Sequence, residues 1–238
     1  MVLTSSPNDQ FRNHSQKPLW QAVDSSTTDR GWVDLPVYGP VWRLLNQWLD
    51  EPSALPQSPG RWLIDADSGC GKTLLCSELR QRNRFRRIKL YHAEFLPGQV
   101  ATANQLIQKW SKVINKDVEL PNWLISQDKL SIWLNLACQC LSRQGYCVRL
   151  VVEADRLDRE TMELVIQKQA LFLRRTPFRG LSASEAPVLP PWSEGDTTEV
   201  IHQKKFGLNL EPDDITRLWA KSRGFPRETI ALLQAGAF

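Results

Sequence analysis

The sequence predicts an α/β fold in which helices cover both faces of a parallel sheet. Three observations support this prediction. Apolar, β-branched segments alternate along the chain with segments whose apolar residues recur at helical spacing. A glycine-containing loop joins the first of these strands to the helix that follows it. The length of 238 residues suits one α/β domain with a small appendage.

The chain begins with a polar segment and a short amphipathic helix. Residues 1–31 are rich in Ser, Thr, Asn, Asp and Gln, so we expect a flexible arm that buries little apolar surface. In the helix, apolar residues recur at helical spacing at Val41, Leu44, Leu45, Trp48 and Leu49. The Pro- and Ser-rich stretch at 51–60 ends this helix.

The alternating elements follow in order. We expect strands at 61–65, 88–95 and 146–152 and helices at 72–82, 102–114, 129–143 and 159–174. A further short strand is compatible with 181–184, before a stretch interrupted by prolines. The C-terminal residues 213–234 are typical of two short helices, broken at Gly224–Pro226.

Composition limits the classes of function. The net charge is only +4, but six cations lie within ten residues. These are Arg80, Arg82, Arg84, Arg86, Arg87 and Lys89. Such a run suits contact with a polyanion such as double-stranded DNA, although it also suits an ordinary solvated face.

Cysteine usage and hydropathy indicate the compartment. The five cysteines are an odd number without a C-x-x-C pair, which predicts neither a disulfide framework nor a zinc site. The N-terminus has no apolar signal-peptide core, and no window of about 18 residues is apolar throughout. We therefore expect a cytoplasmic protein without a membrane partner.

The strongest motif is a phosphate-binding loop. The segment Ala66–Thr73 reads ADSGCGKT and departs from the pattern G-x-x-x-x-G-K-[ST] only at its first position. It follows the apolar strand residues Trp62–Ile64 and opens an amphipathic helix, as the motif requires. The candidate nucleotide-binding residues are Ala66, Asp67, Ser68, Gly69, Cys70, Gly71, Lys72, Thr73 and Leu74.

Each part of this loop has a physical reason. Gly69 and Gly71 permit positive φ and a close approach of the backbone to phosphates, and Ala66 is tolerable if its φ is negative. Successive N–H groups and the helix N-terminus attract the anion. Lys72 supplies a cation to the β- and γ-phosphates, and the Thr73 hydroxyl is a ligand for Mg²⁺. The loop therefore predicts ATP and Mg²⁺ as cofactors.

A second acidic segment lies roughly 80 residues downstream. The residues Leu150–Leu157, LVVEADRL, resemble the Walker B segment of AAA+ proteins, an apolar run followed by D-E-A-[DH]-R-L. In this alignment Glu153 keeps the place of the catalytic Glu, and Val152 replaces the Asp that supports Mg²⁺. Either Glu153 takes over metal support, or the metal depends on Thr73 and phosphates alone. Both interpretations predict weak or absent hydrolysis, and we expect Val152→Asp to raise turnover.

With both motifs placed, residues 38–234 resemble the AAA+ ATPases that regulate transposition, the TniB/TnsC group, with ExeA-like ATPases as relatives. This resemblance implies a nucleotide-binding domain at 32–205 and a small helical lid at 206–238. The segment Gly224–Arg227, GFPR, is similar to the sensor 2 motif. Arg227 would then reach the γ-phosphate from the lid.

Two further AAA+ features are less clear in this sequence. Sensor 1 is a polar residue at the end of the fourth strand, and Ser182 or Ser184 could serve as that residue. An arginine finger, which acts on the ATP of a neighbouring subunit, could be Arg174 or Arg175.

The resemblance implies a DNA-bound assembly factor that self-associates with ATP and recruits a transposase or similar effector protein. An ATPase of a secretion system is the enzymatic alternative. A catalytically inactive protein-interaction scaffold is a third, favoured by the altered Walker B segment and the ten tryptophans. A small-molecule kinase would need a substrate lid, and its C-terminal Arg would be a coincidence.

Overall fold

The computed structural model describes residues 32–51, 62–119, 129–175, 186–204 and 210–237. These residues belong to one compact unit, Trp32–Phe238. The predicted arm at 1–31 and the short strand at 181–184, with Ser182 and Ser184, lie outside the described residues.

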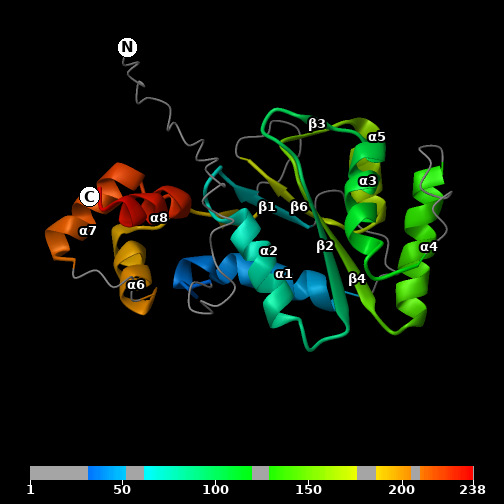
Figure 1. The fold of residues 1–238 in the computed structure, drawn as a ribbon, viewed down its shortest axis with the longest axis horizontal. Helices are drawn as coiled ribbons and strands as arrows, with labels where there is room; N and C mark the ends of the chain where they lie inside the picture. Colours follow the sequence, from blue (N-terminus) through cyan, green and yellow to red (C-terminus); the bar gives the residue numbers. More distant parts are fainter. Residues whose placement is uncertain (1–31, 52–61, 120–128, 176–185, 205–209, 238) are drawn as a thin grey trace, which may run out of the picture. The chain divides into compact units, whose positions relative to one another are not determined.

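Five parallel strands form the main sheet, in the order β2-β4-β6-β1-β7. Their bounds are Leu63–Ala66 for β1, Ile88–Glu94 for β2, Cys147–Glu153 for β4, Leu171–Arg174 for β6 and Val188–Leu189 for β7. Two-residue strands β3 (Val100–Ala101) and β5 (Arg156–Leu157) pair separately. The predicted α/β class with a parallel sheet is confirmed (Figure 1).

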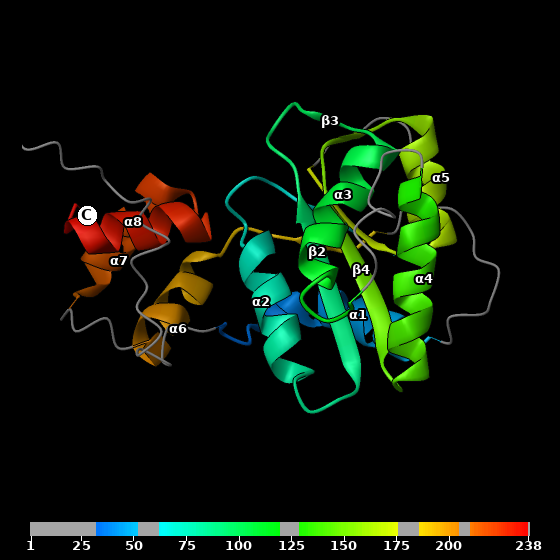
Figure 2. The ribbon, with the colours of Figure 1, turned by 45° about the vertical axis from the view of Figure 1, so that its right-hand side comes forward.

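Helices cover both faces of this sheet (Figures 1 and 2). The 3₁₀ helix η2 (Pro36–Tyr38) leads into α1 (Gly39–Asp50), which packs with α2 (Lys72–Arg82) on one face. Helices α3 (Ala103–Ile114), α4 (Leu130–Arg143) and α5 (Arg159–Gln167) cover the other. The two resulting cores are apolar and deeply buried, which accounts for both faces of the strands being hydrophobic.

A group of three helices forms the C-terminal part. These are α6 (Glu194–Lys204), α7 (Pro212–Ser222) and α8 (Pro226–Ala235). Ile201, Ile215, Leu218 and Leu233 form a small core between them. Helix α6 had no counterpart among the sequence expectations, since its sequence has only a weak apolar face. The domain boundary at residue 206 stays a prediction.

The expected helix at 159–174 is wrong in its second half. Helix α5 ends at Gln167, the backbone turns through Gln169 at a φ of 51°, and β6 begins at Leu171. Strand β6 lies between β4 and β1, so both of its faces are buried. A short, continuous apolar run is consistent with either a buried helix or a central strand. Here the run is a strand because it pairs with β1 on one side and β4 on the other.

A buried ion pair joins the ends of β6 and β1. Arg174 is opposite Asp65 in the strand register and donates to both of its carboxylate oxygens, with Nη2 3.1 Å from Oδ2. The two side chains are only 5% and 8% exposed. Because Asp65 immediately precedes the loop that begins at Ala66, the pair holds the end of β6 beside the phosphate-binding loop.

We expect Arg174→Gln to destabilise the fold by about 3–5 kcal/mol, because it leaves the Asp65 carboxylate buried and unpaired. Chemical denaturation measures this change in the free energy of unfolding. The control is Arg159→Gln, since Arg159 is 93% exposed and pairs with Glu163 at the surface. This control should change stability by less than about 1 kcal/mol. Equal effects of the two substitutions would contradict the role assigned to the buried pair.

Candidate nucleotide-binding site

The phosphate-binding loop has the expected backbone. Strand β1 ends at Ala66, which is fully buried. Gly69 and Gly71 adopt φ values of 89° and 90°, and Ala66 is not among the described residues with positive φ. Gly71 is the N-cap of α2. The substitution of Ala for the first Gly of the motif is therefore compatible with the loop geometry.

The Lys72 ammonium group folds back onto this loop. Its Nζ donates to the carbonyl oxygens of Ala66 and Asp67, at 3.1 and 3.0 Å, and lies 3.5 Å from Glu153 Oε1. The side chain is 7% exposed. Loop, lysine and acidic strand end therefore meet in one place, as the sequence motifs predict. Thr73, the next residue of α2, is exposed.

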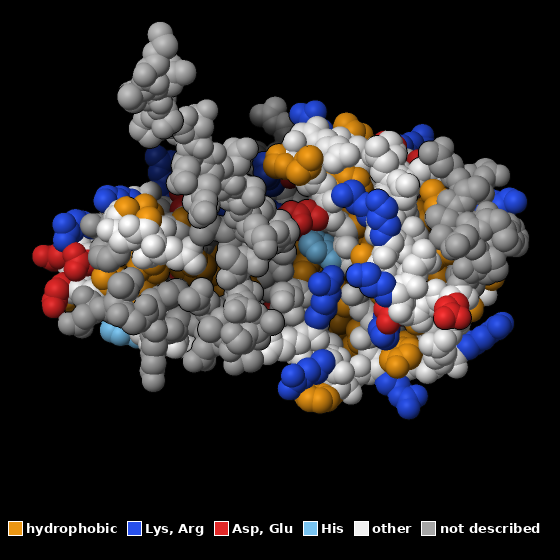
Figure 3. Space-filling model, viewed as in Figure 1, with side chains coloured by type: hydrophobic (Ala, Val, Ile, Leu, Met, Phe, Trp, Pro, Cys, Tyr) orange, Lys and Arg blue, Asp and Glu red, His pale blue; other side chains and the backbone are white. Residues whose placement is uncertain are grey.

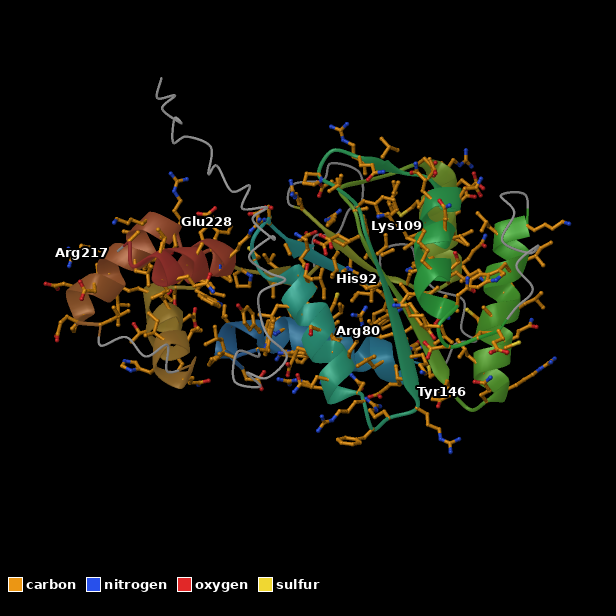
Figure 4. All side chains as sticks on the ribbon, in the orientation of Figure 1. Arg80, His92, Lys109, Tyr146, Arg217 and Glu228 are labelled. Carbon is orange, nitrogen blue, oxygen red and sulfur yellow. The ribbon has the colours of Figure 1, made fainter. Side chains whose placement is uncertain are left out.

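His92 is a partner of Glu153 that sequence reasoning missed. It lies on β2, beside α2 in Figure 4, with Nε2 3.4 Å from Glu153 Oε2. Burial by itself would lower the pKa of His92, but the Cys76 thiol and the Glu153 carboxylate outweigh it and raise this pKa to about 10. Glu153 therefore faces two cations at neutral pH, Lys72 and protonated His92.

The orientation of β4 corrects the interpretation of Val152. Val151 packs with Leu75 and Cys76 in the core on the α2 face, and Glu153 shares that face because alternate strand residues point the same way. Val152 is fully buried in the opposite core, with Phe172. It therefore points away from the phosphate-binding loop and does not occupy the position of a metal-supporting acid. Glu153, on the α2 face, lies beside Lys72 instead.

A small apolar pocket adjoins the loop and has a volume of about 240 Å³, including space open to solvent. Its lining consists of Trp32, Val33, Tyr38, Cys70, Gly71, Leu74, Trp192 and Pro226. Burial raises the pKa of Tyr38 strongly and that of Cys70 to about 11, so both side chains are neutral at pH 7. The pocket lining is therefore apolar and uncharged at neutral pH.

Hydrogen bonds join the C-terminal residues to the loop and to the pocket. The backbone N–H of Arg227 donates to the Gly69 carbonyl at 3.3 Å. Trp192 donates its indole N–H to the Tyr38 hydroxyl at 2.6 Å and its backbone N–H to the Gly224 carbonyl at 2.6 Å. A Cβ at Gly224 would lie 1.9 Å from the Trp192 carbonyl oxygen, so only glycine fits there.

The two candidate finger arginines have different environments. Arg174 is 4% exposed and paired with Asp65, so it cannot reach a neighbouring subunit. Arg175 contacts the loop of its own chain, with Nη2 3.1 Å from Ser68 Oγ and Nε 3.4 Å from Asp155 Oδ1. Arg174 is the last residue of β6 and Arg175 follows it, so both lie at the end of the fourth long strand, and a finger role for Arg175 stays a prediction.

The structure thus brings together most of the predicted site residues. The loop residues, Glu153 and the backbone of Arg227 converge, and Leu74 lines the pocket. His92 was missed because a lone histidine in a strand carries no motif. In the sequence, the aromatic residues of the pocket stand out only as an excess of Trp, because they come together only in the tertiary fold.

Comparison with known proteins supports the fold class. No protein-family model and no curated protein matches the chain. Among solved structures, the crystal structure of Cdc6p from Pyrobaculum aerophilum is similar, with 14% sequence identity and a TM-score of 0.53. The match covers 83% of this chain but only 61% of that protein, less than two thirds of its length. The chain therefore shares the α/β P-loop fold of that structure, and this likeness does not place it in the TniB/TnsC group.

The orientation of Val152 reverses the expectation for Val152→Asp. A carboxylate there would enter the core beside Phe172 rather than approach Thr73. We expect a loss of at least about 3 kcal/mol in unfolding free energy, because an unpaired charge is buried, and no gain in ATP turnover. Denaturation and phosphate release measure the two effects, with Val152→Asn as the uncharged control. A stable Val152→Asp variant with raised turnover would contradict the orientation described here.

Proposed function

We propose that this chain is an ATP-binding AAA+ assembly factor that self-associates on double-stranded DNA and recruits a transposase or similar effector protein. The observation that carries the proposal is the meeting of Lys72 with the glycine loop and Glu153 at the end of β4. We also propose that it acts in the cytoplasm, and its five free cysteines are consistent with a reducing compartment.

ATP fits the residues at the site. The loop N–H groups and Lys72 would hold the phosphates, which requires the ammonium to leave the carbonyls of Ala66 and Asp67. The apolar pocket beside Gly71 would accept the base. Arg227, at the start of α8 and next to Gly69, is well placed for the predicted phosphate contact from the lid.

Mg²⁺, which neutralises phosphate charge when bound, would be held by the Thr73 hydroxyl with Glu153 supporting it. The position of Glu153 on the α2 face favours this role over that of a general base. Ala154 follows, and the Asp155 carboxylate lies beside Arg175. Because Glu153 would support the metal and Ala154, the next residue, has no carboxylate to polarise water, we propose weak ATP hydrolysis.

The basic run from the end of α2 to the start of β2 is the proposed DNA contact, and three of its six cations pair with carboxylates. Arg82 pairs with Asp34 and Glu78, Arg86 with Asp50 and Lys89 with Asp117. Within the described residues, the cations of the run without a carboxylate partner are Arg80, Arg84 and Arg87. On the face drawn in Figure 3, the Lys and Arg side chains of the described residues are scattered rather than gathered in one patch.

The inactive scaffold remains the second candidate, and the neutralised half of the basic run favours it. A scaffold would bind protein partners and would not need DNA. The exposed Phe85, with Arg84 stacked on its ring at 4.4 Å, is the type of residue pair found at protein interfaces. As for the secretion-type alternative, none of the described helices has the length and apolar character needed to cross a membrane.

ATP affinity should depend on Lys72. We expect Lys72→Ala to weaken binding by about 2–4 kcal/mol, since it removes the cation that faces the β- and γ-phosphates. Isothermal titration calorimetry measures the affinity. Lys112→Ala is the control, because Lys112 is an exposed lysine in the last turn of α3, and α3 covers the opposite face of the sheet from α2. Unchanged ATP affinity in Lys72→Ala would rule out the proposed phosphate site.

DNA affinity should depend on the unpaired arginines. We expect the triple change of Arg80, Arg84 and Arg87 to Gln to weaken ATP-dependent DNA binding. The slope of log affinity against log salt should fall by roughly 0.9 for each lost phosphate contact. Filter binding over a salt series, on duplexes of unrelated sequence, measures both effects, and gel filtration checks that ATP-dependent oligomers still form.

The matched control neutralises the paired half of the same run. This control changes Arg82, Arg86 and Lys89 to Gln. It removes three positive charges, as the first variant does, but in wild type carboxylate partners already screen these three. This variant should bind DNA more tightly than the first. Equal salt slopes in wild type and both variants would exclude the run as the DNA contact. No DNA binding by wild type under any nucleotide condition would favour the scaffold.

A further inference from the structure

The turn at residues 83–87, between α2 and β2, carries an aromatic side chain that lies in solvent. Phe85 is 85% exposed, the highest value for a large hydrophobic residue in the part of the chain that the structure describes. The guanidinium carbon of Arg84 lies 4.4 Å from the centroid of its ring and covers only part of it. Because burial of an aromatic ring is favourable, a ligand that covers the rest of this ring gains free energy.

The turn is fixed on both sides of the ring. Asn83 is buried at the end of α2, and its Nδ2 donates to the Leu79 carbonyl at 2.8 Å. Its Oδ1 accepts from Arg86 Nη1 at 3.2 Å, and its carbonyl accepts the Arg86 N–H at 3.0 Å. The Arg87 carbonyl accepts the Cys147 N–H at 2.7 Å, where β2 meets β4. The backbone is therefore already ordered, so binding at this turn costs little conformational entropy.

The charges around the ring indicate the class of ligand. Arg80, Arg84 and Arg87 are exposed, and no described carboxylate pairs with them. Cations that no acid neutralises attract a polyanion. An aromatic ring among such cations is typical of sites for single-stranded nucleic acid, where bases stack on the ring and phosphates meet the cations. In a continuous duplex the base faces are already stacked on one another, and separating them costs energy.

We infer that this turn binds single-stranded DNA, with one base stacked on the open part of the Phe85 ring. The three unpaired arginines hold the phosphates on either side of that base. The inference rests on the proposed contact between these arginines and DNA, and it adds the base contact and the class of strand. Because every base has a π face, the contact is independent of sequence.

The experiment compares, with ATP present, the affinities for a fluorescein-labelled single strand of mixed sequence and for the duplex with its complement, by fluorescence anisotropy. Phe85→Ala should weaken binding of the single strand about tenfold and binding of the duplex less than about twofold, because only the stacked base is lost. Phe85→Trp keeps a ring and should retain the affinity for the single strand. The control Leu96→Ala, which removes a 76% exposed side chain beyond the opposite end of β2, should change neither affinity.

Salt dependence separates stacking from charge. Phe85→Ala removes no charge, so its slope of log affinity against log salt should equal that of wild type. For the single strand, the triple change of Arg80, Arg84 and Arg87 to Gln should lower this slope by roughly 0.7 for each lost phosphate contact.

Three results would overturn the inference. Phe85→Ala would bind the single strand as tightly as wild type, or lose equal affinity for strand and duplex, or form smaller ATP-dependent oligomers in gel filtration, since the ring would then contact another copy of the chain. Wild type that binds the duplex but not the single strand also overturns this inference alone. Wild type that binds neither contradicts the proposed DNA function as well.

Discussion

The buried pair between Asp65 and Arg174 is the constraint on which the site depends. It joins the two central strands at the edge where the phosphate-binding loop begins. A buried charge pair adds little net stability compared with apolar residues, but it tolerates no change of register because each charge needs its partner. The pair therefore sets where the loop starts and which way Arg175 points.

The cations and acids around the loop satisfy one another in this structure. Lys72 and His92 share the carboxylate of Glu153, and Arg175 lies between Ser68 and Asp155. A triphosphate would compete for these cations as a stronger, multiply charged partner. Nucleotide binding would thus release acids at the end of β4, next to β5 and α5.

The C-terminal helices are joined to the sheet domain near the phosphate-binding loop. Trp192 bonds to Tyr38 on the core side and to Gly224 on the lid side, and it also lines the apolar pocket. A base in that pocket would contact the residue that joins the two parts. The Trp219 indole, which donates to the Trp192 carbonyl at 3.0 Å, adds a third bond to this junction. Pocket and lid position are therefore physically coupled.

The sequence by itself determined the parallel α/β class and the conformation of the loop. Strand–loop–helix order and the glycines at 69 and 71 are local properties, because each depends on a few adjacent residues. It did not determine that residues 171–174 form a strand, or that Val152 faces away from the loop, since both depend on which elements lie on either side. Only the tertiary structure decided that His92 and Arg175 join the site, because charges far apart in the chain meet there only once the strand order is set.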